Sequence, residues 1–328
     1  MPGEFDLIQT YFTRPARRAR LGVGDDCALI DVPAGMEVAV STDMLVEGVH
    51  FLAGTDAQRL GHKTLAVNLS DLAAMGATPR YATLAIALPT VDQSWLAAFS
   101  RGFFMIADVH DVELMGGDTT RGPLNVCVTL LGEVPAGTAV KRSGAQAGDE
   151  VWVSGTLGDA ALGLAYLLGQ RSLTPAQAEY AVSRLEVPTP RVTLGIALRG
   201  IASAMLDLSD GLAGDLRHIA QACGLDAVIE ADALPFSTQL APAFAAMTQE
   251  QRLHLAAGGG DDYELCFTAP VALHRAVRAA AARCGVAVTK IGRMTSRRGA
   301  LGAVLIDDAK GNPCAPTVSG YDHFGNHP

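Results

Sequence analysis

The sequence predicts a mixed α/β (α+β) fold divided into two domains. Three observations support this prediction. A length of 328 residues is more typical of two domains than of one. Strand-like and helix-like segments alternate in both halves. The segment 135–150, "PAGTAVKRSGAQAGDE", is rich in Gly, Ala and polar residues, as linkers are. We therefore expect an N-terminal domain over residues 1–138 and a C-terminal domain over residues 139–328.

The N-terminal half contains four strand-like and two helix-like segments. "MEVAVSTD" has apolar residues at alternate positions, which is typical of a half-buried strand. The predicted strands are 36–43, 81–89, 111–118 and 124–134, and the predicted helices are 57–75 and 94–110. The first and third of these strands end in Asp43 and Asp118.

The C-terminal half begins again with a strand and a helix. The predicted elements are a strand in "EVWVSG", a helix in "DAALGLAYLLG", the stretch "SAMLDLSDG", a helix ending at Gly224, and strands in "DAVIEA" and "YELCFTAP". Asp207 and Asp210 flank Leu208 and Ser209 in "LDLSDG".

The composition excludes several classes of protein. Hydrophobic residues make up 49% of the chain and charged residues 18%, as in an ordinary globular protein with a substantial core. The formal charge is -9 and aromatic residues are 5%, which argues against binding to nucleic acid or to an anionic membrane surface. The longest apolar runs fall short of the ~20 residues that a membrane helix needs. The start of the chain has no pattern of a signal peptide.

The six cysteines are widely and irregularly spaced, and none forms a CxxC pair. This usage predicts reduced thiols in a cytoplasmic protein and neither a zinc site nor a redox motif.

The helix in "TLAVNLSDLAAMGATP" carries a carboxylate where burial is expected. Leucine, valine and alanine occupy most of its faces, and a helix that is apolar on nearly every side is usually buried. Asp71 shares one face with Thr64 and Asn68. Because a bare buried carboxylate is costly, we expect Asp71 to face a partner of opposite charge.

Several other acids follow an apolar run or lie beside glycine. They are Asp25, Asp26, Asp43, Asp118, Asp207, Asp210, Asp261 and Asp262. Singly, each has a structural interpretation: Asp210 as a helix cap, Asp26 and Asp118 as turn residues. Together at one sheet edge they would repel one another and need protons or cations. A carboxylate-rich, all-oxygen set suits Mg²⁺, Mn²⁺ or Ca²⁺ rather than zinc. A cluster of several carboxylate-bound Mg²⁺ ions usually handles phosphate esters.

The common phosphate-binding loops are absent from the sequence. "GHKT" at 61–64 lacks the spacing of a Walker loop, and "VSGTLGDAALG" lacks G-x-G-x-x-G. If the chain binds ATP, it uses another fold.

Seven motifs in order resemble one known family. They are "GVGDDCAL", "STDMLVEGVHF", "AVNLSDLAAMGA", "GGDTTRG", "LDLSDGL", "GGDDYELCF" and "GYDHF". Together they resemble the thiamine-monophosphate kinases of the aminoimidazole ribonucleotide synthetase-like ATP-binding superfamily. The resemblance runs from residue 3 to residue 324.

This resemblance implies a fold and a reaction. The N-terminal domain would bind ATP and Mg²⁺ and pair in a homodimer through its sheet, and the C-terminal α/β domain would close the site. The reaction would be direct in-line transfer of the γ-phosphoryl group of ATP to thiamine monophosphate, which gives thiamine diphosphate and ADP.

The resemblance also implies roles for individual residues. The implied metal ligands are Asp26, Ser41, Thr42, Asp43, Asp71, Asp118, Asp207 and Asp210. The implied ATP contacts are Gly117, Asp118, Arg142 and Ser209, and the implied substrate-side residues are His50, Asp261 and Val318. Arg142, Asp71 and Asp210 are the candidate catalytic residues, with the Arg142 guanidinium on the transferring group.

Two positions depart from the family pattern, and other interpretations remain open. Asp261 stands where the family commonly has Glu, and Val318 where it often has an aromatic residue. Without the resemblance, Arg142 would be a solvated linker residue and His50 a turn residue. The alternative functions are a superfamily enzyme with a different small phosphorylated or acidic acceptor, and a non-catalytic nucleotide-binding or metal-binding protein.

Overall fold

The structure is a computed structural model that describes residues 3–297 and 302–314. It divides into two compact units. The first comprises the chain up to Leu72 together with Ala77–Thr138, and the second comprises Ala73–Gly76 and the chain from Ala139 on. Both units combine a sheet with helices, so the expected mixed α/β fold is confirmed. Within the described residues, no helix is both long enough and apolar enough to span a bilayer.

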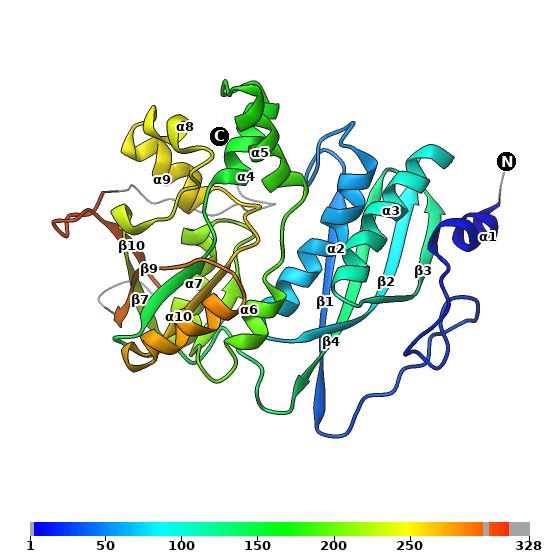
Figure 1. Ribbon diagram of the computed structural model, residues 1–328, viewed down its shortest axis with the longest axis horizontal. Helices are drawn as coiled ribbons and strands as arrows, with labels where there is room; N and C mark the ends of the chain where they lie inside the picture. The colour runs from blue at the N-terminus through cyan, green and yellow to red at the C-terminus, as the bar shows by residue number, and fades with distance from the viewer. Residues whose placement is uncertain (1–2, 298–301, 315–328) are drawn as a thin grey trace. The chain divides into compact units, whose positions relative to one another are not determined.

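The first unit is a four-stranded sheet with the order β1-β4-β2-β3. Its elements are α1 (Glu4–Leu7), a π-helical turn (Ile8–Phe12), β1 (Met36–Val46), α2 (Ala57–Ala74), β2 (Thr78–Leu88), α3 (Gln93–Val109), β3 (Glu113–Arg121) and β4 (Asn125–Pro135). The β1–β4 and β4–β2 pairs are antiparallel, whereas β2 and β3 run parallel. Helices α2 and α3 cover one face of this sheet (Figure 1).

The inner face of this sheet and its two helices form the core of the first unit. Its fully buried side chains include Leu65, Leu69 and Leu72 from α2, Phe99 and Phe103 from α3, and Val126, Val128 and Leu130 from β4. The two helices approach closely through glycines. A Cβ on Gly61 would lie 2.0 Å from the Phe99 carbonyl oxygen, and one on Gly102 would lie 1.8 Å from that of Gln58. The predicted burial of α2 is thereby confirmed.

Strands β1 and β3 are longer than predicted. Strand β1 continues for three residues past Asp43 because it pairs with β4 as far as the Val46–Asn125 position. Strand β3 starts at Glu113 and runs through both glycines to Arg121, paired with β2 throughout. The expectation that Asp43 and Asp118 end their strands is therefore wrong, because cross-strand pairing outweighs the local turn signals.

The second unit contains a six-stranded sheet with the order β10-β7-β9-β5-β8-β6. Its strands are β5 (Glu150–Ser154), β6 (Ala204–Asp207), β7 (Leu225–Glu230), β8 (Leu265–Ala269), β9 (Val288–Ser296) and β10 (Val304–Asp307). Its helices are α4 (Asp159–Leu167), α5 (Pro175–Glu186), α6 (Val192–Ala197), α7 (Leu212–Cys223), α8 (Ala241–Ala245), α9 (Gln249–Gly258) and α10 (His274–Arg283). Short 3₁₀ turns span Ala231–Ala233 and Val271–Leu273.

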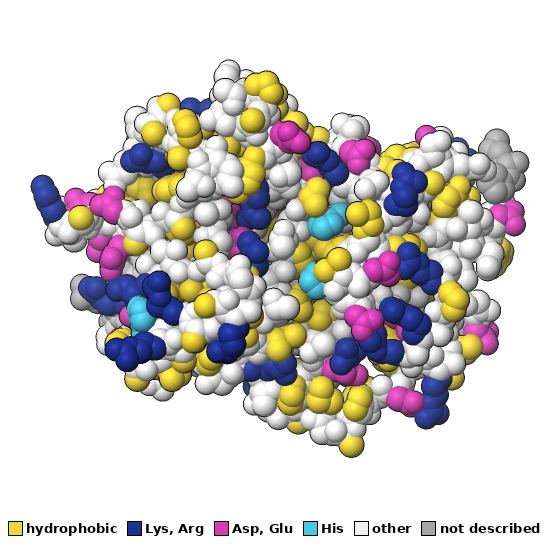
Figure 2. Space-filling model, in the orientation of Figure 1, with side chains coloured by type: hydrophobic (Ala, Val, Ile, Leu, Met, Phe, Trp, Pro, Cys, Tyr) yellow, Lys and Arg dark blue, Asp and Glu magenta, His cyan; other side chains and the backbone are white. Residues whose placement is uncertain are grey.

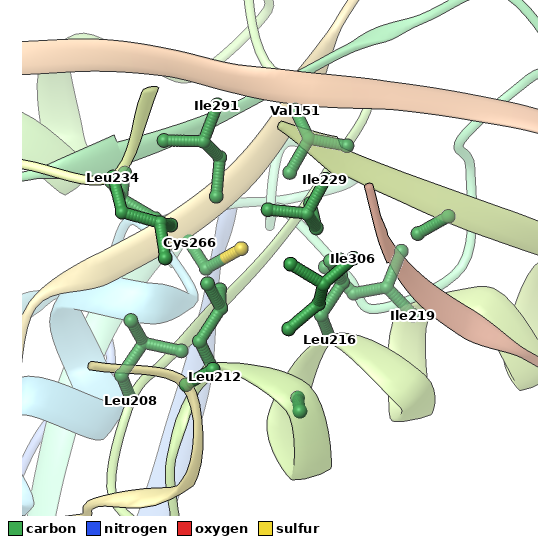
Figure 3. Packing of buried hydrophobic residues seen from close by; sticks show 14 of the residues in the cluster. Val151, Leu208, Leu212, Leu216, Ile219, Ile229, Leu234, Cys266, Ile291 and Ile306 are labelled. Atoms are coloured by element: carbon green, nitrogen blue, oxygen red, sulfur yellow. The ribbon is translucent and has the colours of Figure 1, made fainter. Parts of the chain in front are cut away.

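Helix α7 supplies much of the core of the second unit. Figure 3 shows Leu212, Leu216 and Ile219 of α7 pointing towards strand residues that include Cys266 and Ile306. The apolar positions of α7 recur every three to four residues, so one face of the helix is buried. This packing fixes the start of α7, and with it the loop that carries Ser209 and Asp210.

Charged side chains of both signs occur among hydrophobic ones on the face of the molecule in Figure 2. Lys and Arg side chains are densest over α10, whose sequence "HRAVRAAAAR" carries three arginines.

Candidate active site

Asp71 projects from α2 towards the inner face of β1. Ser41 and Asp43 are two residues apart on β1, so their side chains point to this same face. The Ser41 hydroxyl donates a hydrogen bond to Asp71 Oδ2, and Asp71 also hydrogen-bonds to Asp43. The residue predicted to face a cation thus lies beside a second carboxylate and a hydroxyl.

The environment of Asp43 favours its protonated form. Burial raises the pKa of Asp43 to about 7, and the neighbouring Asp71 carboxylate adds to the rise through its charge and a hydrogen bond. Two neighbouring, partly buried carboxylates repel each other when both are charged, so the protonated form of Asp43 is favoured. A bound cation would replace that proton, so the chemistry of this donor set fits a metal site.

Thr42 lies on the opposite face of the sheet from this pair. Its side chain is exposed, and its Oγ1 lies 2.8 Å from Thr129 Oγ1 on β4. The structure therefore does not bring the Thr42 side chain to Asp43 and Asp71.

The polar residues of α2 around Asp71 are also buried. Asn68 donates from Nδ2 to the Thr64 carbonyl oxygen at 3.3 Å, and the Thr64 hydroxyl donates to the Leu60 carbonyl oxygen at 2.8 Å. In residues 3–297 and 302–314, Asn68 Oδ1 and Ser70 Oγ are buried without a hydrogen-bond partner. The helix therefore presents unsatisfied polar atoms close in sequence to Asp71.

Asp26, Gly117 and Asp118 line a pocket of about 780 Å³ in the first unit. The loop Gly22–Ala28 and the edge strand β3 form its polar side. Phe5, Ile8 and Phe12 contribute apolar side chains from the N-terminal helical segment. A pocket with apolar and polar sides of this size suits a small organic phosphate.

Gly117 allows β3 to pass close to β2 at this pocket. A Cβ at Gly117 would lie 1.8 Å from the Leu84 carbonyl oxygen, and its φ is +154°. The adjacent Gly116 has open space at the same position. The family resemblance implies that Gly117 contacts ATP, and the structure adds a packing reason for the glycine.

The two groups of acids in the first unit lie at opposite edges of the sheet. Asp43 is on edge strand β1 and Asp118 on edge strand β3, with β4 and β2 between them. Three strand spacings separate these edges by about 14 Å. One ion cannot contact Asp43 and Asp118 of the same chain, and the part of the chain that the structure describes contains no cluster of three or more His, Cys, Asp or Glu side chains able to hold a metal. Within this unit, the expectation that the acids converge at one edge is wrong.

His50 lies in the turn that follows β1. The Val46 backbone N–H donates to His50 Nδ1 at 3.1 Å, and the Lys63 ammonium donates to the His50 carbonyl oxygen at 3.3 Å. These contacts give His50 a role in stabilising the turn. Its substrate-side role remains a prediction.

In the second unit, two loops bring Asp207, Ser209, Asp210 and Asp261 together. Asp207 ends β6 and is buried, and the next four residues lead into α7. The Asp261 N–H donates to the Ser209 carbonyl oxygen at 2.8 Å, which joins the second loop to the first.

Glycines make this contact between the loops possible. A Cβ on Gly260 would lie 2.3 Å from the Ser209 carbonyl oxygen, and one on Gly211 would lie 2.9 Å from the backbone of Gly258. Asp261 itself has a φ of +65°, a left-handed conformation uncommon for a residue with a side chain. The tight packing therefore fixes the backbone at Asp261.

Arg142 is exposed in the segment after the first unit. Its carbonyl oxygen accepts a hydrogen bond from Cys223 Sγ at 3.6 Å. Burial lowers the pKa of His218, the positive charge of Arg142 lowers it further, and the negative charge of Asp210 opposes this. Arg142 and Asp210 therefore both act on His218, which places them on the same side of this unit.

Two buried acids lie behind these loops, and of the two the sequence pattern singled out Asp262 but not Asp215. Asp215 accepts hydrogen bonds from three backbone N–H groups of the loop, and both oxygens of Asp262 accept from the Gly158 N–H at 3.1 Å. Burial is the main cause of a raised pKa at both acids. It raises the pKa of Asp215 to about 7, and it also raises the pKa of Asp262. Each is the last residue of a short glycine-containing motif, "SDGLAGD" or "GGGDD", and the second acid of the first motif is the signal that points to Asp215.

Glu264 anchors the second loop through buried ion pairs. It accepts hydrogen bonds from Arg184 at 2.9 Å, from Arg191 Nε at 2.6 Å and from the Ser154 hydroxyl at 2.5 Å. Val318, the remaining predicted substrate residue, lies outside the described residues.

Comparison with known proteins identifies relatives over both halves of the chain. Residues 24–134 match the family described as AIR synthase related protein, N-terminal domain, and residues 146–303 match its C-terminal domain. The thiamine-monophosphate kinase of Salmonella typhimurium is 47% identical over 327 residues, which covers 98% of each chain.

Solved structures agree with this relationship. The thiamine-monophosphate kinase from Stenotrophomonas maltophilia superposes with a TM-score of 0.82 at 46% identity and covers 90% of this chain and 92% of its own. The complex of AaThiL with AMPPCP and TMP superposes with a TM-score of 0.75 at 30% identity and covers 98% and 97%. On the strength of its similarity over both domains, the chain belongs to the thiamine-monophosphate kinase family.

Proposed function

We propose that this chain transfers the γ-phosphoryl group of ATP to the phosphate of thiamine monophosphate, giving thiamine diphosphate and ADP. The observation that carries the proposal is the 47% identity to an enzyme of that name over 98% of both chains. The AaThiL complex with AMPPCP and TMP, an ATP analogue beside the proposed acceptor, supports the same pair of substrates. The acceptor oxygen is already anionic near neutral pH, so the chain needs to position charge rather than to supply a strong base.

The 780 Å³ pocket of the first unit is the proposed nucleotide site. Its apolar side chains suit a base, and its glycine-containing strand and loop offer backbone groups to phosphates. We assign Gly117 and Asp118 to this site, as the family resemblance implies. The family resemblance also assigns Ser209 and Arg142 to nucleotide binding.

The proposed cofactor is Mg²⁺, bound as several ions. The proposed ligands are Asp26, Ser41, Thr42, Asp43, Asp71, Asp118, Asp207 and Asp210, with Thr42 able to contribute only its backbone from the described position. Mg²⁺ in proteins is often bound by one or two carboxylates together with substrate phosphate and water oxygens, so the Asp43–Asp71 pair needs no third protein carboxylate. Such ions neutralise the charge on the phosphates and align the attacking oxygen.

The chain's own residues then have separate tasks. Asp43 and Asp71 would hold the metal when it is bound, and the Ser41 hydroxyl keeps Asp71 oriented. Arg142 supplies positive charge to the transferring phosphoryl group. Asp261 and His50 face the acceptor, with Asp261 one methylene shorter than the glutamate common in the family.

We further propose a cytoplasmic homodimer. Alternate residues of β1 on the face opposite α2 are hydrophobic and exposed: Val38, Val40 and Met44 are 37%, 61% and 54% accessible. An exposed apolar sheet face is typical of an interaction surface. We assign ATP binding, Mg²⁺ binding and dimerisation to the domain of residues 1–138. We assign closing of the site to the domain of residues 139–328.

The test is incubation of the purified chain with MgATP and thiamine monophosphate, with chromatography of both products. We expect ADP and thiamine diphosphate in equal amounts, and no product in EDTA. ADP formed only with another phosphorylated acceptor would support the alternative superfamily enzyme. Nucleotide binding without turnover of any acceptor would support the non-catalytic alternative.

A further inference from the structure

One buried carboxylate holds the loop between β6 and α7. Asp215 Oδ2 accepts hydrogen bonds from the backbone N–H groups of Ser209, Asp210 and Gly211, at 3.1, 3.0 and 3.1 Å. Asp215 is only 5% exposed. Three successive peptide groups are thus directed at a single oxygen, which fixes the conformation of the loop.

This contact differs from an ordinary helix cap. A capping side chain precedes the helix and accepts from N–H groups in its first turn. Helix α7 begins at Leu212, whereas Asp215 lies within the first turn and reaches back to N–H groups that precede or border the helix. The side chain therefore organises the loop more than the helix.

The second loop holds Ser209 from the other side. The Ser209 carbonyl oxygen accepts the Asp261 N–H, while the Ser209 N–H donates to Asp215. Both backbone polar groups of Ser209 are thus committed to the fold. Gly260 packs against the same carbonyl so closely that a Cβ would not fit. With its backbone held in this way, Ser209 retains its side chain for contact with a ligand.

We propose that Asp215 is a positioning residue that orients Ser209 and Asp210 for the magnesium-bound nucleotide. The inference rests on the proposed function, because the roles of Ser209 and Asp210 come from that function. Asp215 itself contacts neither substrate: its carboxylate lies behind the loop, and Oδ2 is occupied by the three N–H groups. It acts by keeping the loop in one conformation before the nucleotide arrives, which removes an ordering cost from binding.

The test is Asp215→Asn, which keeps the size of the side chain and replaces the carboxylate with a weaker acceptor. Asp226→Asn is the matched control. Asp226 is also buried in the second unit, and its carboxylate accepts the Ala303 N–H at 3.0 Å. It lies on β7, which β9, β5 and β8 separate from β6. The probe is AMPPCP with Mg²⁺, measured by calorimetry, alongside steady-state turnover.

For Asp215→Asn we expect binding of Mg-AMPPCP to weaken about tenfold and kcat/KM to fall roughly 10- to 100-fold, as for a small displacement of positioning groups. The KM for thiamine monophosphate should change less than the nucleotide affinity, because Asp215 meets the acceptor side indirectly, through the hydrogen bond from the Asp261 N–H to the Ser209 carbonyl oxygen. Asp226→Asn should lower the melting temperature and leave nucleotide binding per folded molecule unchanged. Backbone amides 209–211 should exchange faster with solvent in nucleotide-free Asp215→Asn than in the unsubstituted protein.

A double-mutant cycle separates positioning from general destabilisation. If Asp215 acts through Asp210, then in the Asp210→Asn background Asp215→Asn should weaken Mg-AMPPCP binding much less than tenfold. Additive losses, or unchanged binding by Asp215→Asn, would overturn the inference. Asp215→Glu, which keeps the charge and displaces it by one methylene, serves as the variant if Asp215→Asn does not fold.

The binding assay needs no acceptor, so failure of the proposed role of Asp215 can be distinguished from failure of the proposed function. A chain that binds Mg-AMPPCP and phosphorylates no thiamine monophosphate contradicts the proposed function, while the binding data still decide the role of Asp215. Normal binding by the Asp215 variants in an active thiamine-monophosphate kinase contradicts only the role of Asp215.

Discussion

At the scale of single residues, Asp71 shows how an apolar helix tolerates an acid. Its neighbours on α2 are buried, but its carboxylate meets Ser41 and Asp43 on β1 rather than hydrocarbon. The pair of carboxylates is costly when both are charged. Protonation, or the metal ion that we propose there, would remove that cost.

Asp71→Asn tests the proposed catalytic role of this acid. The substitution keeps the shape of the side chain and removes one charge that we assign to metal binding. We expect turnover to fall by about 10²-fold or more, as when a group that stabilises transition-state charge is lost. Single-turnover phosphoryl transfer with excess Mg²⁺ is the measurement. Near-normal turnover per folded molecule, with a lower melting temperature, would show that Asp71 is only structural.

The pH dependence of stability tests the electrostatic interaction between Asp43 and Asp71. Burial raises the folded-state pKa values of Asp43 and Asp215 to about 7, well above those of an exposed aspartate. The folded state therefore binds more protons than the unfolded state between about pH 4 and pH 7, and stability is lost as pH rises through that window. Melting in EDTA should show a lower midpoint at pH 8 than at pH 5. Asp71→Asn should weaken this slope, because it removes a neighbouring charge from Asp43, and an unchanged slope would contradict that coupling.

At the scale of elements, the β2–β3 pair depends on one glycine. A Cβ at Gly117 would meet the Leu84 carbonyl oxygen, whereas Gly116 has open space. We expect Gly117→Ala to destabilise the protein by about 1–3 kcal/mol, the usual range for overpacking. Gly116→Ala should stay within about 0.5 kcal/mol. Denaturant unfolding of both variants is the measurement, and equal effects would mean that β3 can shift away from β2.

Buried ion pairs tie α5 and the connection after it to the segment that enters β8. Glu264 is fully buried and serves Arg184 and Arg191 together. Glu264→Gln leaves two largely buried guanidinium groups without their shared carboxylate, so we expect a loss of about 3–5 kcal/mol in the free energy of unfolding. The control is Asp31→Asn, which breaks the exposed pair with Arg20 and should cost no more than about 1 kcal/mol. A loss below about 1 kcal/mol for Glu264→Gln would show that the pairs are not needed for stability.

At the scale of the whole molecule, the exposed face of β1 is the proposed dimer surface. Val40→Glu places a charge at the most exposed of its hydrophobic positions. We expect light scattering to show a dimer for the unsubstituted chain and a monomer for Val40→Glu at micromolar concentration, because burying an unpaired charge in an interface is costly. Val109→Glu on α3, at a position 78% exposed, should leave the mass unchanged. A monomeric unsubstituted chain would remove the proposal of dimerisation.

The sequence by itself determined the fold class, the positions of α2 and α3 within a few residues, and the family. These features depend on local signals: apolar periodicity, Gly and Pro at the ends of segments, and short motifs that recur in a fixed order. The identity of Asp71 as an acid on a buried helix was also evident from the residues around it.

Only the tertiary structure decided which of these residues meet. Asp43 and Asp118 end strand-like patterns in the sequence, but pairing with β4 and β2 extends both strands and leaves the two acids on opposite edges of the sheet. Thr42 and Asp43 are neighbours in the chain and point to opposite faces. The anchoring of the loops by Asp215 and Glu264 depends on contacts with residues whose partnership no local pattern encodes, such as Glu264 with Arg184 and Arg191. Sheet order and long-range hydrogen bonds arise from how the whole chain packs, so a linear pattern can supply the residues of a site without fixing their arrangement.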